Sequence, residues 1–130
     1  MMRQLIGAAA GLVVILASTI LAQPAQAEFH FKLLGATPKD EAVLETPPTS
    51  IELRFSAEPD LAGTRVRLIN EDHEIVELGK VTADAEDPTV VFAPIEGDAS
   101  HGGYAIHWRG MAKDGHVVTG ELTFEVEISR

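Results

Sequence analysis

Apolar and polar residues alternate along most of this chain, which is the pattern of β-strands with one buried face. Ile51, Leu53 and Phe55 alternate with Glu52 and Arg54, and residues 64–69 alternate in the same way. The pattern is clearest near the end, where residues 104–108 and 122–128 carry an apolar side chain at every second position. Short apolar runs at 31–34, 75–78 and 89–92 complete a set of about seven strands.

Turn-forming residues separate these strands at short intervals, as in all-β sandwiches and barrels. We therefore predict one Ig-like Greek-key β-sandwich or barrel. A single helix-like stretch of about one turn is expected at residues 39–44. The predicted core consists of the inward-facing apolar positions: Leu53, Phe55, Val66, Leu68, Phe92, Tyr104, Ile106, Trp108, Leu122, Phe124 and Val126. The acidic positions of the last strand, Glu121, Glu125 and Glu127, are expected to face solvent.

The first 27 residues have the composition of an export signal. Arg3 precedes an apolar run at 5–21, and Ala25-Gln26-Ala27 supplies a small-x-small cleavage pattern. We expect a cleavable signal peptide at 1–27 and one domain at 28–130. The rival interpretation is a single membrane anchor, because 18 residues at 5–22 are borderline for a span. The polar residues that follow favour cleavage, and hence a periplasmic protein.

Composition excludes several classes of function. The chain has no cysteine, so disulfides, thiolate metal sites and cysteine nucleophiles are excluded. All 20 acidic residues lie in 28–130 with nine basic ones, a net charge of −11 with neutral histidines, which argues against a nucleic-acid partner. No G-x-S-x-G, H-E-x-x-H or phosphate-binding glycine loop occurs. We expect a protein that is not an enzyme.

Two separated segments carry residues that suit Cu(II), which prefers nitrogen and oxygen donors in a square-planar or tetragonal set. Cleavage after residue 27 would free the amine of Glu28 two residues before His30. Asp114 and His116 flank Gly115 in the connection between the last two strands. In an Ig-like sandwich that connection lies at the same end as the start of the first strand. We therefore predict one Cu(II) per chain, bound by His30, Asp114 and His116, with the Glu28 amine as a further donor.

The remaining histidines have simpler interpretations. His73 lies in a turn among acidic residues and is expected to be solvated. His101 starts the strand whose far end leads to Asp114, so it should lie at the opposite end of the sandwich. His107 alternates out of phase with Ile106 and Trp108, so its side chain should point away from the core.

Over about residues 30–128 the sequence resembles the CopC family of periplasmic copper-binding proteins, also called YobA-like. The resemblance rests on residues 30–33 before Ala36-Thr37-Pro38-Lys39-Asp40, on residues 51–56, and on residues 104–109 leading to 113–120. It implies a first histidine at His30 and a D-x-H pair at Asp114 and His116 as Cu(II) ligands. It also implies a cupredoxin-like fold and delivery of copper to an inner-membrane transporter of the CopD type.

The chain departs from the family pattern in two places. Family members usually carry the ligand histidine as the first residue of the mature protein, whereas Glu28 and Phe29 precede it here. An amine and a histidine at position three can wrap Cu(II) by themselves. Asp114 and His116 would then be unused, act as axial ligands of that ion, or form a competing ligand set with His30. Residues 28–130 also contain a single methionine, Met111, so we predict no methionine-rich Cu(I) site.

The predicted function is a monomeric periplasmic protein that sequesters or delivers Cu(II) for copper homeostasis or resistance. Its first alternative is an Ig-like structural or interaction module in which the Asp-Gly-His loop is only a turn. A copper-dependent oxidase is a further alternative. The position of the mature N-terminus decides whether the Glu28 amine can bind the metal.

Overall fold

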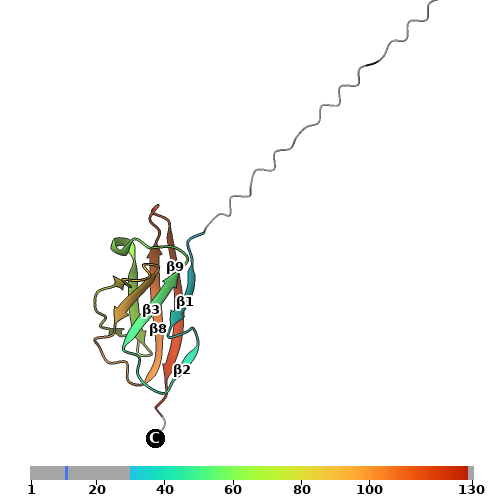
Figure 1. Ribbon diagram of the computed structural model, residues 1–130. Coiled ribbons are helices and arrows are strands. Elements are labelled where there is room, and N and C mark those ends of the chain that lie inside the picture. The colour runs from blue at the N-terminus through green and yellow to red at the C-terminus, as the bar shows by residue number, and fades with distance from the viewer. Residues whose placement is uncertain (1–10, 12–29, 129–130) are drawn as a thin grey trace, which may run out of the picture.

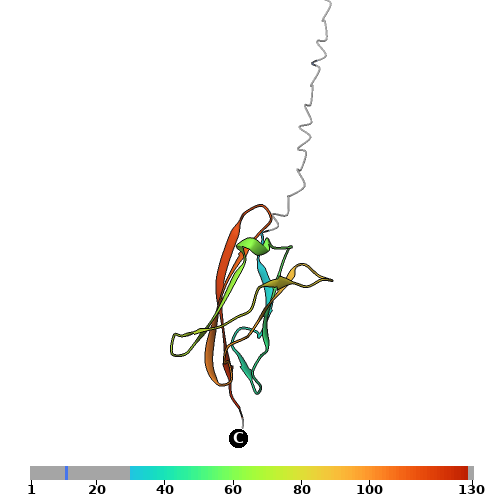
Figure 2. The same cartoon turned by 90° about the vertical axis from the view of Figure 1, so that its left-hand side faces the viewer.

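The computed structural model describes residue 11 and residues 30–128, and shows two β-sheets packed face to face (Figures 1 and 2). The predicted signal segment (apart from residue 11) and Glu28 lie outside the described residues. One sheet has the order β1 (Leu33–Thr37), β3 (Ser50–Phe55), β7 (Val90–Pro94), β6 (Thr82–Ala83). The other has the order β2 (Ala42–Leu44), β9 (Val117–Val126), β8 (Gly102–Met111), β4 (Arg65–Asn70), β5 (Ile75–Val76).

The all-β prediction is confirmed, with nine strands in the described residues where about seven were expected. The two long strands β8 and β9 pair antiparallel along their whole length, from Gly102 opposite Val126 to Met111 opposite Val117. β1 occupies Leu33–Thr37, so it starts two residues later than the expected 31–34 strand and extends three residues beyond it. Phe31, at the start of the domain, lies beside Gly110 near the end of β8.

The helix-like interpretation of residues 39–44 was wrong. Glu41 has a positive φ of 60°, which a right-handed helix does not tolerate, and Ala42–Leu44 forms β2, parallel to β9. The Glu41 amide donates to the Thr123 carbonyl, and the Asp40 carboxylate accepts from the Thr123 amide. The short helical turn lies instead at η1 (Leu61–Gly63), where the Asp60 carboxylate accepts from the Ala62 amide.

The core lies between the two sheets and follows the predicted alternation with one exception. Ile51, Leu53 and Phe55 of β3 are almost fully buried, and β8 and β9 bury Tyr104, Ile106, Phe124 and Val126. Phe92 was wrongly placed in the core, because its neighbours Val91 and Ala93 face inward and Phe92 is only half-buried on the opposite face of β7. Val66, Trp108 and Leu122 are half-buried against the core, and Glu121, Glu125 and Glu127 are exposed.

Candidate metal centre

The loop between β8 and β9 presents Asp114 and His116 at one end of the sandwich. The Ala112 amide donates to the His116 carbonyl, and the Gly115 amide donates to the Ala112 carbonyl. Gly115 has a φ of +94°, so this is a tight turn that needs a residue with left-handed freedom at that position. Glycine is the residue that adopts this conformation without a steric cost. The turn therefore places the two side chains that flank Gly115 on the same tip.

The loop is also held from outside the hairpin. Ala112 forms an isolated bridge with Pro59, and the Asp60 amide donates to the Met111 carbonyl over 2.8 Å. The Met111 side chain lies against Gly63 of η1, where a Cβ would approach its sulfur to within 2.5 Å. The β8 end of the short loop is thus anchored to residues 59–63, while its tip is solvent-exposed.

Asp114 and His116 are in direct contact. His116 Nδ1 lies 2.8 Å from Asp114 Oδ2, and the His116 amide donates to Asp114 Oδ1 over 3.0 Å. The donation from the backbone amide and then from the imidazole holds the pKa of the Asp114 carboxyl below its usual range. The carboxylate is therefore ionised and orients the imidazole ring, which leaves Nε2 as the ring nitrogen away from this contact.

His30 approaches this tip from the start of the domain. Ser56, which follows β3, accepts from the Lys32 amide and donates to the His30 carbonyl through its hydroxyl. The Ser56 amide in turn donates to the Lys32 carbonyl over 2.8 Å. The next side chain, Phe31, is buried in the core. These contacts hold the backbone of His30 at the edge of the sandwich, and its side chain is exposed.

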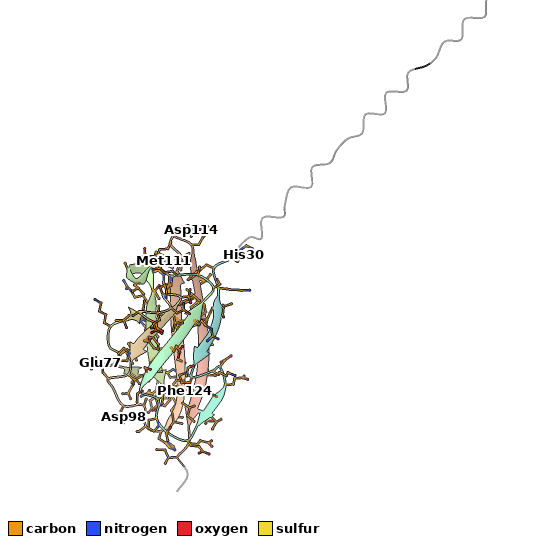
Figure 3. All side chains as sticks on the ribbon, viewed as in Figure 1. His30, Glu77, Asp98, Met111, Asp114 and Phe124 are labelled. Carbon is orange, nitrogen blue, oxygen red and sulfur yellow. The ribbon has the colours of Figure 1, made fainter. Side chains whose placement is uncertain are left out.

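The tertiary structure brings the three candidate side chains to one hollow. Its lining residues are His30, Phe31, Ala57, Glu58, Ala112, Lys113, Asp114, His116, Val117 and Val118. Figure 3 shows His30 and Asp114 at the same end of the molecule, away from Asp98. In the part of the chain that the structure describes, no three His, Asp or Glu side chains are yet gathered as a ready metal cluster. His30, Asp114 and His116 thus share one hollow, and their side chains are exposed there.

Glu58 also lines the hollow, and the sequence patterns did not single it out. Its carboxylate lies 3.6 Å from the Lys113 ammonium, and both groups are more than half exposed. The signal that could have identified it is its position in the segment that follows β3, two residues after Ser56, which holds the His30 backbone. The pair connects the loop to the segment that follows β3.

The other histidines lie where the alternation predicted. His101 precedes β8 at the far end from the hairpin tip, and its carbonyl accepts from the Tyr104 hydroxyl. The exposed His107 lies on the outer face of β8, 4.0 Å from the Glu121 carboxylate of β9. His73 is exposed in the β4–β5 turn with a φ of 62°. Glu28, the fourth predicted metal-binding residue, lies outside the described residues.

The family model for the CopC domain matches residues 33–127. The chain belongs to the CopC family. It is 29% identical over 121 residues to copper resistance protein C of Xanthomonas campestris pv. juglandis, covering 88% of this chain and 92% of that protein. It is also 29% identical to copper resistance protein C of Pseudomonas syringae pv. tomato, covering 79% of this chain and 85% of that protein. These relatives connect the family to copper resistance.

Solved structures of the family share the fold. CopC from Methylosinus trichosporium OB3b superposes with a TM-score of 0.70 at 22% identity, covering 78% of this chain and 97% of that one. PcoC from Escherichia coli, a methionine-rich copper resistance protein, superposes with a TM-score of 0.66 at 26% identity, covering 75% of this chain and 99% of that one. Among the described residues, no helix has the length and apolarity to cross a bilayer.

Proposed function

We propose that this CopC-family protein binds one Cu(II) in the hollow between His30 and the β8–β9 loop. The observation that carries the proposal is that His30 lines the same hollow as Asp114 and His116, although more than 80 residues separate it from them in sequence. Two imidazoles and a carboxylate are the donor types that suit Cu(II). The contact between Asp114 and His116 Nδ1 leaves Nε2 of His116 to face the metal. Carboxylates commonly orient metal-binding histidines in this way.

The amine of Glu28 is the fourth donor of the proposal. Cleavage after Ala27 would free it two residues before His30, close enough for amine and imidazole to bind the same ion. The proposal therefore includes processing of residues 1–27 and residence of residues 28–130 in the periplasm. Intact-mass measurement of the exported protein tests this directly, because cleavage before or after Glu28 changes the mass and the terminal donor.

The biological role that we propose is to sequester Cu(II) or deliver it, in support of copper homeostasis or resistance, without catalysing a reaction. The exposure of His30, Asp114 and His116 at one end of the sandwich supports this role, because a partner can reach the ion there. A membrane copper transporter of the CopD type is the acceptor that we propose. The Cu(II) form is the one that we assign to this hollow.

Titration of the exported protein with Cu(II) tests the site. We expect one equivalent to bind, and His30→Ala and His116→Ala each to weaken binding by more than about 100-fold, beyond the usual effect of losing an orienting partner. Asp114→Asn should weaken it by about 10–100-fold. His101→Ala is the matched control, since His101 lies at the opposite end. Unchanged binding in both the His30 and His116 variants would rule this site out and place the bound Cu(II) elsewhere. Absence of Cu(II) binding in the unmodified protein would favour a sandwich module without a metal.

A further inference from the structure

A group of arginines lies on the outer face of the five-stranded sheet. Arg65 of β4 lies directly opposite Arg109 of β8, and Arg67 lies directly opposite His107. These four residues line one hollow together with Trp108, Thr119, Gly120 and Glu121. We call Arg65, Arg67 and Arg109 the arginine patch. Arg65 and Arg67 are exposed, and Arg109 is half-buried.

The arginine patch has no structural explanation within the chain. Like charges directly opposite each other on neighbouring strands destabilise a sheet. Within residues 30–128, none of the three guanidinium groups forms an ion pair, and the nearby Glu121 lies closest to His107. The chain carries 20 acidic residues against 10 basic ones, so a concentration of unpaired arginines on one face runs against its overall charge.

The arginine patch lies toward the end of this face that carries the loop with Asp114 and His116. Arg109 is two residues before Met111, the last paired residue of β8, and the loop with Asp114 and His116 follows directly. At about 3.3 Å per residue, a segment bound across Arg109 would lie within roughly 15–20 Å of the hairpin tip. A protein that contacts this face is therefore close enough to contact the exposed metal donors as well.

We propose that the arginine patch is the docking surface for an acidic, extended segment of a partner protein that exchanges copper with this chain. Arg65 and Arg67 are two residues apart on one strand, so their side chains leave the sheet about 6.6–6.8 Å apart. Carboxylates at alternate positions of an extended peptide have the same spacing. Guanidinium groups bind carboxylates through paired hydrogen bonds, and Arg109 extends the cationic surface across the neighbouring strand.

The overall charge of the chain favours a peptide segment over an anionic membrane surface. Residues 28–130 carry a net charge of −11 with neutral histidines, so a broad negative surface repels most of the molecule. A short acidic segment touches only the arginine patch and avoids that repulsion. The copper-exchange part of this inference rests on the proposed function, whereas docking itself can be measured on metal-free protein.

The experiment uses metal-free exported protein and a blocked eight-residue peptide of alternating glutamate and threonine. Trp108 is the only tryptophan and lines the hollow, so its fluorescence reports binding, and amide NMR shifts locate it. The test variant is the triple substitution Arg65→Gln, Arg67→Gln and Arg109→Gln. Its matched control is Arg54→Gln, an exposed arginine on β3 of the other sheet. A peptide with glutamine in place of glutamate controls for charge.

We expect saturable binding at low ionic strength, with NMR shifts concentrated on β4 and β8. The triple variant should bind about tenfold more weakly or worse, the Arg54 variant should be unchanged, and added salt should weaken binding to the unmodified protein. Absence of binding, equal binding of the glutamine peptide, or shifts away from β4 and β8 would overturn the proposal. Binding to phosphatidylglycerol vesicles that depends on the three arginines, without peptide binding, would replace it with a lipid site.

Copper titration of the triple variant separates this inference from the proposed function. We expect its Cu(II) affinity to match that of the unmodified protein, because none of the three arginines lines the hollow of His30 and His116. Loss of copper binding in that variant would contradict a separate docking surface. Failure of copper binding in the unmodified protein would sink the proposed function and leave the peptide result standing by itself.

Discussion

The Phe31 ring stacks on the Phe55 ring with centroids 5.0 Å apart and planes 15° apart. Phe55 in turn meets Trp108 edge to face at 5.9 Å. Gly110 makes room for this cluster, since a Cβ there would lie 2.7 Å from Phe55 and 2.9 Å from Phe31. The backbone of His30 is therefore held in place by the aromatic residue that follows it. The position of a candidate copper ligand depends on core packing.

Replacement of Phe31 with alanine is expected to weaken both the fold and the metal site. Loss of the buried ring should cost about 3 kcal/mol or more of unfolding free energy. Copper binding should also weaken in conditions where the variant is fully folded, because His30 loses its anchor. Urea unfolding and Cu(II) titration measure the two effects. Phe92→Ala is the control, since Phe92 is half-buried away from the core. An unchanged Cu(II) affinity in folded Phe31→Ala would show that the packing of Phe31 does not position His30 for metal binding.

Replacement of Gly115 with alanine is expected to distort the loop. The space around Gly115 is open, so the cost comes from its φ of +94° and amounts to about 1–2 kcal/mol. The loop can relieve this cost by moving Asp114 and His116, which should lower the Cu(II) affinity. Gly103→Ala is the matched control, because a Cβ there meets only ordinary contacts with Glu71, the nearest atom at 3.8 Å. Equal Cu(II) affinities of the two variants would show that the turn conformation does not position the donors.

The pKa of Asp114 in metal-free protein should lie below the usual aspartate value. The His116 backbone amide and imidazole stabilise the carboxylate in the folded loop. Because the folded-state pKa is lowered, this stabilisation is present above the unfolded pKa and is lost as the pH falls through the folded pKa. Carboxyl carbon NMR shifts measured against pH give the value directly.

The His116→Ala variant isolates the contribution of the imidazole. It removes the ring and keeps the backbone amide, so the Asp114 pKa should rise toward the usual value without reaching it. Asp98 is the control, because hydrogen bonds from Ser100 lower its pKa at the other end of the sandwich. A pKa of Asp114 that stays the same in this variant would mean that the imidazole contact is absent in solution.

Trp108→Ala should destabilise the sandwich by about 3 kcal/mol, toward the lower end of the range for a buried tryptophan. The ring is half-buried, but it contacts Phe55 and fills the space above Gly120, where a Cβ would come within 2.6 Å of it. Ile75→Ala, at a side chain that is 70% exposed, should change stability by less than about 0.5 kcal/mol. Similar denaturant midpoints for the two variants would contradict the packing of Trp108.

The sequence alone was sufficient for the fold class and most of the core. Period-two alternation is a local property of each strand, and it identified Leu53, Phe55, Ile106 and Phe124 as inward-facing. It placed Phe92 wrongly, because a run of four residues with several apolar side chains does not show which face of the strand is buried. Residues 42–44 form a strand rather than a helix, because Asp40 and Glu41 bond to Thr123, a partner more than 80 positions away, and the segment pairs with β9.

The sequence by itself identifies the chemistry of the candidate donors, since imidazole and carboxylate groups suit Cu(II) wherever they occur. Their convergence depends on the tertiary structure, because strand pairing across the sandwich brings His30 to the β8–β9 loop. Arg65 lies opposite Arg109 because of the register of β4 on β8, and Glu58 lies beside Lys113 next to the bridge between Pro59 and Ala112. Local periodicity determines which face of a strand is buried, whereas only the paired sheets determine which exposed side chains become neighbours.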